Sequence, residues 1–245
     1  MSPGEEELNA QSRPASDDEI QRLDTLLHVA GLAPSWSQME YRILEEGTTV
    51  GQQLIGGSGI VFSWDWTKLW IHEALLAEPD LRVINVLAHE YQHTEFARQH
   101  PSNFLDESGS RYIASDESLN DGIWDLPPLD GMTVAQAAED AEAWNWLLQG
   151  VQIALEDEAR AYYAGLSAQR AYVDATQTDP RLLGEAARDA MMAATDYDSF
   201  IEAHYASLDA ARMVLDIQDV GSTQPLDGDY LWDALRSIAG SGDLF

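Results

Sequence analysis

Two histidines and a glutamate stand close together in the segment His89-Glu90-Tyr91-Gln92-His93. In an α-helix, residues four apart project from one face about one turn apart, so both imidazoles can bind the same ion. Neutral imidazole suits Zn²⁺ at about 2.0–2.1 Å, and a carboxylate beside the ion can take a proton from the water that the ion activates. The spacing therefore predicts a zinc site with His89 and His93 as ligands and Glu90 as the general base.

This five-residue pattern resembles the H-E-x-x-H signature of the zincin metallopeptidases. The resemblance implies hydrolysis of a peptide bond in a peptide or protein substrate, with one Zn²⁺ ion as the cofactor. One large branch of the zincins adds a third histidine in the pattern H-E-x-x-H-x-x-G-x-x-H. In this chain Phe96 stands in place of that glycine and Gln99 in place of that histidine, and His100 is one residue out of register. The sequence therefore disfavours this branch.

The other main branch, the gluzincins, takes a glutamate as its third ligand from a later helix, in patterns such as E-x-E-A-N-x-F-A. Residues 155–164, Leu-Glu-Asp-Glu-Ala-Arg-Ala-Tyr-Tyr-Ala, resemble that pattern. Alignment on Ala159 implies Glu156 as the third ligand, whereas helical periodicity favours Glu158, which falls on the apolar face. The motif alignment is given more weight, so Glu156 is the expected third ligand and Glu158 the alternative. Arg160 stands where the family usually has Asp or Asn, so the usual partner of a ligating histidine is not evident.

Several later side chains are candidates for stabilising an oxyanion. Attack of water on a carbonyl creates a negative oxygen, which needs a hydrogen-bond donor aimed at it. The sequence offers Tyr162, Tyr163 and His204, with Tyr205 beside the last of these. Such residues are more often involved in packing, so the sequence identifies them only as candidates for this role.

The histidine motif needs an element that holds both rings on one side. From Asp80 to Pro101, apolar residues recur at helical spacing, which predicts an amphipathic helix with the motif inside it. Upstream, apolar runs between residues 40 and 76 predict short strands, among them 48–55 and 68–72. By the zincin resemblance, residues 68–72 are expected to be an edge strand that pairs with an extended substrate.

The remaining elements are predicted to be mainly helical. Residues 101–132 are rich in Ser, Asp, Gly and Pro and predict a long loop. Start and stop signals predict helices over roughly 17–31, 133–177, 180–218 and 229–238. The expected fold class is α+β: a small twisted sheet packed on the helix that carries the motif, followed by a mainly α-helical C-terminal half.

We expect one folded domain preceded by an arm. Residues 1–17 are polar and acidic and contain two prolines, which predicts a disordered acidic arm. Residues 18–245 are predicted to form a single domain, in which 18–132 supply the sheet and the active-site helix and 133–245 form a helical subdomain.

Composition narrows the chemistry and the partners. The 245 residues include no cysteine, so a metal site must use histidines and carboxylates. The formal charge of −30, with only 13 Lys and Arg, disfavours nucleic acid as a partner, because phosphate contacts need basic side chains. No leader pattern and no run of about 18 apolar residues is evident, so we expect no membrane segment and a cytoplasmic location. The sequence leaves the oligomeric state open.

Two other functions compete with peptide hydrolysis. The chain can be a zinc-binding regulatory protein that keeps the metal site and has little turnover. Alternatively, its acidity can serve to bind a basic partner by electrostatic attraction, although a charged surface is more often an adaptation for solubility or high salt.

Overall fold

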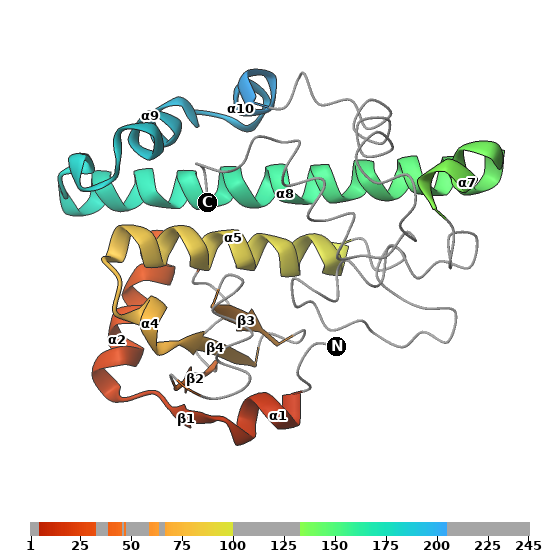
Figure 1. Ribbon diagram of the computed structural model, residues 1–245. Helices are drawn as coiled ribbons and strands as arrows, with labels where there is room; N and C mark the ends of the chain where they lie inside the picture. The colour runs from red at the N-terminus through yellow and green to blue at the C-terminus, as the bar shows by residue number, and fades with distance from the viewer. Residues whose placement is uncertain are drawn as a thin grey trace.

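A small sheet lies against a layer of helices in the computed structural model of the chain (Figure 1). The structure describes residues 5–32, 39–45, 47, 59–63, 67–99 and 133–204. Most of the regular structure in these residues is helical, and the α+β class predicted from the sequence is confirmed. The strand expected at 48–55, the loop expected at 101–132 and the helix expected at 229–238 lie outside the described residues.

The sheet has a mixed topology. Its strands in the described residues are β1 (Ser12–Pro14), β2 (Glu40–Leu44), β3 (Ile60–Phe62) and β4 (Lys68–His72), in the order β1-β2-β4-β3. β2 and β4 run parallel, whereas β1 and β3 are each antiparallel to their neighbours.

The expectation that residues 68–72 form an edge strand is wrong. β4 pairs with β2 on one side and with β3 on the other, so β3 lies at the edge of the described sheet. Leu69, Trp70 and Ile71 are all buried, although successive side chains of a strand point to opposite faces. A strand that is apolar on both faces is suited to the middle of a covered sheet, which explains the position of β4.

The main core lies between one face of the sheet and two helices. Side chains from β2, β3 and β4 on this face meet the apolar sides of α2 (Asp17–Val29) and α5 (Asp80–Gln99). The buried members include Leu23, Leu26, Leu27, Ile43, Phe62, Leu69, Ile71, Val83, Ile84 and Leu87. The amino-terminal half of α5 is thereby fixed to the sheet through apolar contacts on one of its sides.

The N-terminal segment is part of the sheet, which differs from the expectation of a disordered arm over residues 1–17. Residues 5–10 form α1 (Glu5–Ala10), and β1 pairs with β2 so that Ser12 lies opposite Leu44. Leu8 is only 2% exposed and packs with Leu44, Val61 and Trp70 on the outer face of the sheet. One apolar residue among acidic ones gives no periodic signal, so the sequence pattern did not reveal this packing.

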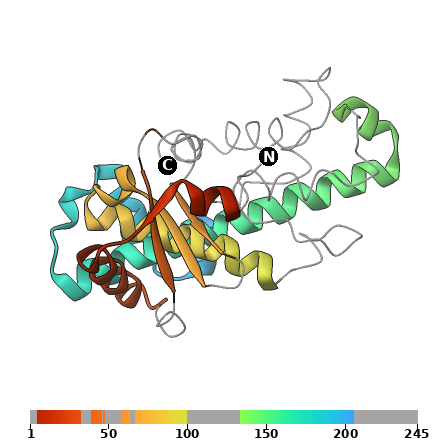
Figure 2. The same cartoon turned by 90° about the horizontal axis from the view of Figure 1, so that it is seen from below.

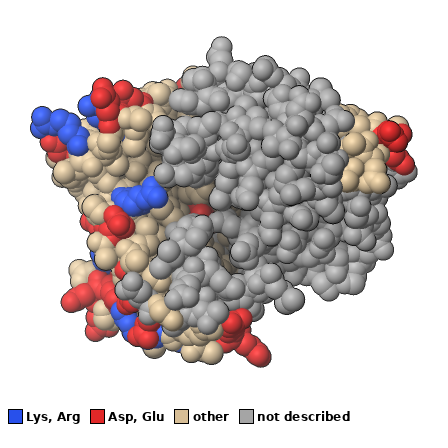
Figure 3. Space-filling view, viewed as in Figure 1, with Lys and Arg blue, Asp and Glu red and all other residues tan. Residues whose placement is uncertain are grey.

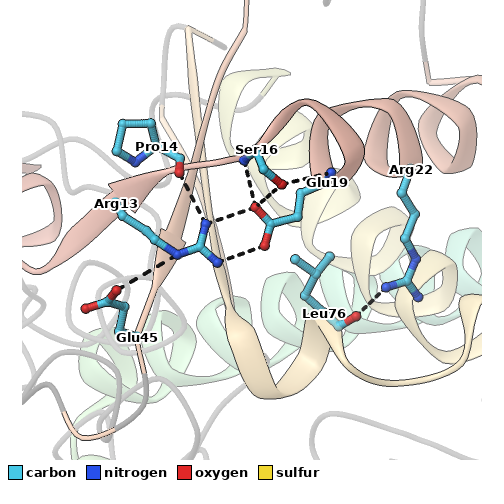
Figure 4. A network of polar contacts seen from close by, with 7 residues as sticks. All are labelled: Arg13, Pro14, Ser16, Glu19, Arg22, Glu45 and Leu76. Atoms are coloured by element: carbon cyan, nitrogen blue, oxygen red, sulfur yellow. Dashed lines mark hydrogen bonds and ion pairs between the residues drawn. The ribbon is translucent and has the colours of Figure 1, made fainter.

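A polar network joins β1 to the start of α2 (Figure 4). Ser16 caps α2 in a reciprocal capping box with Glu19. Arg13 of β1 donates two hydrogen bonds to the Glu19 carboxylate, at 2.8 and 2.9 Å, and lies 3.9 Å from Glu45. These hydrogen bonds, with a further contribution from Ser16, lower the pKa of Glu19 to about 2.

α5 and α8 (Ala141–Thr176) pack against each other: they lie one above the other in Figure 1, and α5 crosses α8 at an angle in the view from below (Figure 2). Leu81 of α5 contacts Gln169 of α8, and His93, further along α5, contacts Asp157, which comes earlier in α8. The two helices are therefore antiparallel. Tyr172 donates a hydrogen bond to Asp80, and Gln169 donates one to the backbone carbonyl of Leu81. The same pairing continues along α5 to the histidine motif, as described below.

Shorter helices complete the described part of the chain. They are α4 (Glu73–Leu76), α7 (Val134–Glu139), the 3₁₀ helix η3 (Pro180–Leu182), α9 (Glu185–Ala193) and α10 (Tyr197–His204). α9 and α10 pack on α8 through a second apolar cluster that includes Leu166, Met191 and Phe200. The single helix expected from residue 180 is therefore divided into three elements within the described residues.

Candidate metal centre

One stripe of α5 faces α8 and carries both histidines. Leu81, Asn85, His89 and His93 follow one another at intervals of four residues, so they lie along one side of the helix. The apolar residues Val83, Ile84 and Leu87 occupy another side and pack into the main core. The core contacts fix the rotation of α5 about its axis. Because of this rotation, the two histidines point towards α8.

Small residues on α8 allow this close approach. A Cβ atom added at Gly165 would lie 2.9 Å from Asn85 Nδ2 and 3.0 Å from the Asn85 carbonyl oxygen. One turn earlier, Ala161 is fully buried. Because Gly165 and Ala161 occupy little space, the backbones of the two helices approach closely. Polar side chains such as Asp157 and His93 can then contact each other across the interface.

The three residues of the motif converge on one point. His89 Nε2 and His93 Nε2 are 3.0 Å apart, with ring centroids 4.6 Å apart and ring planes at 80°. Glu90 Oε1 lies 3.8 Å from His89 Nε2, and one ligand atom from each of the three residues lies within 4.8 Å of the others. His93 is 4% and Glu90 9% exposed. Among the described residues, this is the group of side chains able to hold a metal ion.

The two nitrogens fit a zinc ion. Two ligands on a tetrahedral ion at about 2.0–2.1 Å are themselves about 3.3 Å apart. The observed separation of 3.0 Å between the Nε2 atoms is close to this value, so a small opening of the ring pair accommodates the ion. Neutral imidazole nitrogens are also ligands that zinc prefers when no thiolate is present, and the chain contains no cysteine.

Asp157 of α8 binds the other side of the His93 ring. Its Oδ2 atom lies 2.8 Å from His93 Nδ1, and the Asp157 side chain is buried with 6% of the residue exposed. Sequence reasoning missed this residue because it weighed only the flanking glutamates as ligands. A signal was present, since Asp157, Ala161 and Gly165 recur every four residues and so form one polar and small stripe on α8.

The structure does not bring Glu156 to the histidines. The Glu156 side chain is 45% exposed, and its Oε1 atom accepts hydrogen bonds from Arg160 at 2.7 and 3.0 Å. Arg160 also stacks on Phe96 and Tyr197, which holds the pair on the surface of α8. Glu158 belongs to α8, and its side chain lies outside the part that the structure describes. The identity of the third ligand therefore stays a prediction.

The oxyanion candidates have different surroundings. The ring of Tyr162 lies edge-on to His89, with ring centroids 5.1 Å apart, so this tyrosine borders the metal centre. Tyr163 instead packs against Tyr197 and Phe200 in the cluster beneath α10. His204 ends α10, and its side chain lies outside the described part, as does Tyr205.

Tyr91, inside the motif, anchors α5 to the sheet. Its ring meets Phe62 of β3 edge-on at 6.2 Å, and burial raises its pKa. The edge strand of the described sheet therefore packs directly on the turn of α5 that carries Glu90 and His93.

Comparison with known proteins gives no relative from which a function can be transferred. No model of a protein family matches the chain, and no curated protein and no solved structure matches it significantly. In the part of the chain that the structure describes, no helix is both long and apolar enough to cross a membrane. Any functional conclusion therefore depends on the residues and their geometry.

Proposed function

We propose that this chain is a zinc-dependent peptidase, with His89 and His93 as metal ligands and Glu90 as the general base. The observation that carries this proposal is the convergence of the two histidine rings and the Glu90 carboxylate, whose ligand atoms lie within 4.8 Å of one another, with Glu90 and His93 buried. The same three residues carry the zincin resemblance of the sequence. Spacing and geometry support the same chemistry.

Each residue has a distinct role in this reaction. A zinc ion held by the two imidazoles would supply Lewis acidity, which polarises a carbonyl group and acidifies water. Glu90 accepts the proton of the attacking water and then donates it to the leaving amine. Tyr162 is the better placed of the oxyanion candidates, because its ring contacts His89.

A glutamate of α8 is the proposed third ligand, and Glu158 is favoured over Glu156. Position 158 precedes Tyr162 by four residues, so the two positions lie one turn apart on the same side of α8. Tyr162 contacts His89 on that side, whereas the carboxylate of Glu156 is exposed and bound to Arg160.

Replacing Glu90 by Gln tests the enzymatic proposal. The Glu90→Gln variant is expected to keep its zinc and to lose about 10²-fold or more of its hydrolytic rate, because the amide cannot accept the proton. Zinc content is measured by atomic emission after purification without added metal, and cleavage with labelled casein and a mixed peptide library. Glu95→Gln, which removes a neighbouring carboxylate from the same helix, is the matched control and should retain both zinc and activity.

Two outcomes would contradict the enzymatic proposal. Wild-type protein that binds no zinc excludes the metal centre altogether. Stoichiometric zinc without cleavage of any substrate, unchanged in Glu90→Gln, favours the zinc-binding regulatory protein instead. The acidic-partner alternative rests on the formal charge of −30 alone, and on the described part of the face in Figure 3 Lys and Arg lie among the acidic side chains.

A further inference from the structure

The contact between Asp157 and His93 joins two distant parts of the chain. The residues are 64 positions apart, on α8 and α5, and each is more than nine-tenths buried. A buried carboxylate stays satisfied only when it is paired or hydrogen-bonded, and here the ring nitrogen at 2.8 Å meets that need. Glu156, directly before Asp157, is the residue to which the gluzincin resemblance assigns a ligand role, and Glu158, directly after it, is the alternative favoured by helical periodicity.

We propose that Asp157 is the positioning residue for the zinc ligand His93. This inference rests on the proposed zinc site. The Asp157 carboxylate accepts the Nδ1 proton of His93, which fixes the ring orientation and leaves the lone pair on Nε2. Asp157 is not itself a ligand, because its bound oxygen lies at Nδ1, across the ring from Nε2.

The tautomer that Asp157 selects agrees with the contact at the opposite nitrogen. With the proton of His93 on Nδ1, its Nε2 atom accepts a hydrogen bond from His89 Nε2, which matches the 3.0 Å separation. For His89 Nε2 to serve as a metal ligand as well, the His89 proton would have to pass to Nδ1 of the same ring, which keeps that imidazole neutral.

Charge adds to this geometric effect. A carboxylate at Nδ1 increases the basicity of the imidazole, and burial between two helices strengthens the interaction because little water screens it. A ring rotated by half a turn would place a carbon atom against Asp157 and leave the carboxylate without this hydrogen bond. Asp157 therefore disfavours the orientation of His93 that cannot bind metal.

Zinc affinity in a set of variants tests this role. Asp157→Ala is expected to weaken zinc binding about 10–100-fold, the usual effect of losing a partner behind a ligating histidine. Asp157→Asn should show a smaller loss, because its amide oxygen still accepts the Nδ1 proton but carries no charge. The dissociation constant is measured by competition with a chromophoric chelator at one pH. Asp174→Ala, which removes an exposed aspartate from the same helix, is the matched control.

A spectroscopic measurement separates positioning from general stability. The visible absorption of the Co²⁺-substituted protein reports the ligand field, so it should shift in Asp157→Ala and Asp157→Asn and stay unchanged in Asp174→Ala. Circular dichroism of each metal-free variant checks folding. If Asp157→Ala does not fold, the shape-preserving Asn variant decides.

The outcomes distinguish this inference from the function on which it rests. Wild-type protein that binds no zinc overturns the proposed function, and this inference with it. Wild-type protein that binds zinc, together with folded Asp157 variants whose affinity and Co²⁺ spectrum match the wild type, overturns the positioning role alone. A graded loss in the order wild type, Asn, Ala supports it.

Discussion

The imidazole of His93 is held at both of its ring nitrogens. Asp157 lies at Nδ1 and His89 at Nε2, at 2.8 and 3.0 Å. A residue fixed in this way loses little freedom when it binds an ion, so little ordering cost opposes binding. His89 and His93 are two of the proposed zinc ligands, and a carboxylate of α8 is expected to be the third.

The third ligand is predicted to be Glu158. Glu158→Gln should weaken zinc binding by more than the roughly 10–100-fold expected from an outer partner such as Asp157, because it removes a ligand itself. Glu156→Gln should leave the zinc affinity nearly unchanged and cost only about 0.3–0.5 kcal/mol of stability, the typical value of an exposed ion pair one turn apart on a helix. Chelator competition and thermal unfolding of the two variants measure both effects. Loss of zinc in Glu156→Gln alone would restore the assignment implied by the sequence alignment.

Among the elements, α5 and α8 form the proposed zinc site, which depends on how closely these two helices approach each other. The register pairs Leu81 with Gln169, Asn85 with Gly165, and His93 with Asp157, always four or eight residues further along each helix. Each step is about one or two helical turns, so the antiparallel helices keep the same faces together over this length. The Leu81–Gln169 contact at one end and the His93–Asp157 contact at the other therefore belong to one continuous interface.

Gly165→Ala is expected to separate the helices. The added methyl group would meet Asn85 at 2.9–3.0 Å. Such overpacking costs about 1–3 kcal/mol, which is expected to outweigh the gain of about 1 kcal/mol in helix propensity. The variant should unfold at a lower temperature and bind zinc more weakly, because the Asp157–His93 contact lengthens.

Gly184→Ala provides the control for this experiment. No atom lies within 4 Å of a Cβ built at Gly184, and its φ angle of −58° suits any residue. Because Gly184 is the N-cap of α9, a position where Ala is less favourable than Gly, the control is expected to lose up to about 1 kcal/mol of stability but to keep its zinc affinity. If Gly165→Ala is at least as stable as the wild type and binds zinc equally well, the close approach is not needed for the site.

At the scale of the whole molecule, the N-terminal segment extends the sheet and covers its outer face. β1 adds a strand beside β2, and Leu8 closes the small cluster around Trp70. The hydrogen bonds from Arg13 to Glu19 then fasten this segment to α2 (Figure 4). The attachment of the segment is therefore partly electrostatic and should depend on pH.

Arg13→Ala is predicted to lower stability only where Glu19 is ionised. The pKa of Glu19 falls from 4.5 to about 2 on folding, so the Arg13 contact contributes fully above pH 4.5 and its contribution is lost as the pH falls towards 2. Both side chains are partly exposed, so solvent screening limits the effect to about 0.5–1 kcal/mol. Urea unfolding of wild type and variant at several pH values measures the difference.

The Glu19→Gln background serves as the control for the pH experiment. In that background, the effect of Arg13→Ala on stability should change much less between pH 6 and pH 2.5, because only the longer contact with the exposed Glu45 remains. If Arg13→Ala lowers the unfolding free energy of otherwise wild-type protein by the same amount at every pH, Arg13 acts through packing and not through the charge of Glu19.

Features that depend on local spacing could be predicted from the amino-acid sequence. His89, Glu90 and His93 share a helix because five neighbouring residues with apolar flanks are enough to fix their relative positions. The α+β class follows in the same way from runs of strand and helix periodicity. These features need no knowledge of which distant segments meet.

Only the tertiary structure decided which distant groups meet. It placed β4 in the middle of the sheet, paired β1 with β2, and brought Asp157 to His93 while leaving Glu156 exposed. A rotation of α8 by one residue, about 100°, exchanges one of these carboxylates for the next. That rotation is set by side chains that fill or leave space between the helices, such as Gly165 against Asn85, and no local pattern records it.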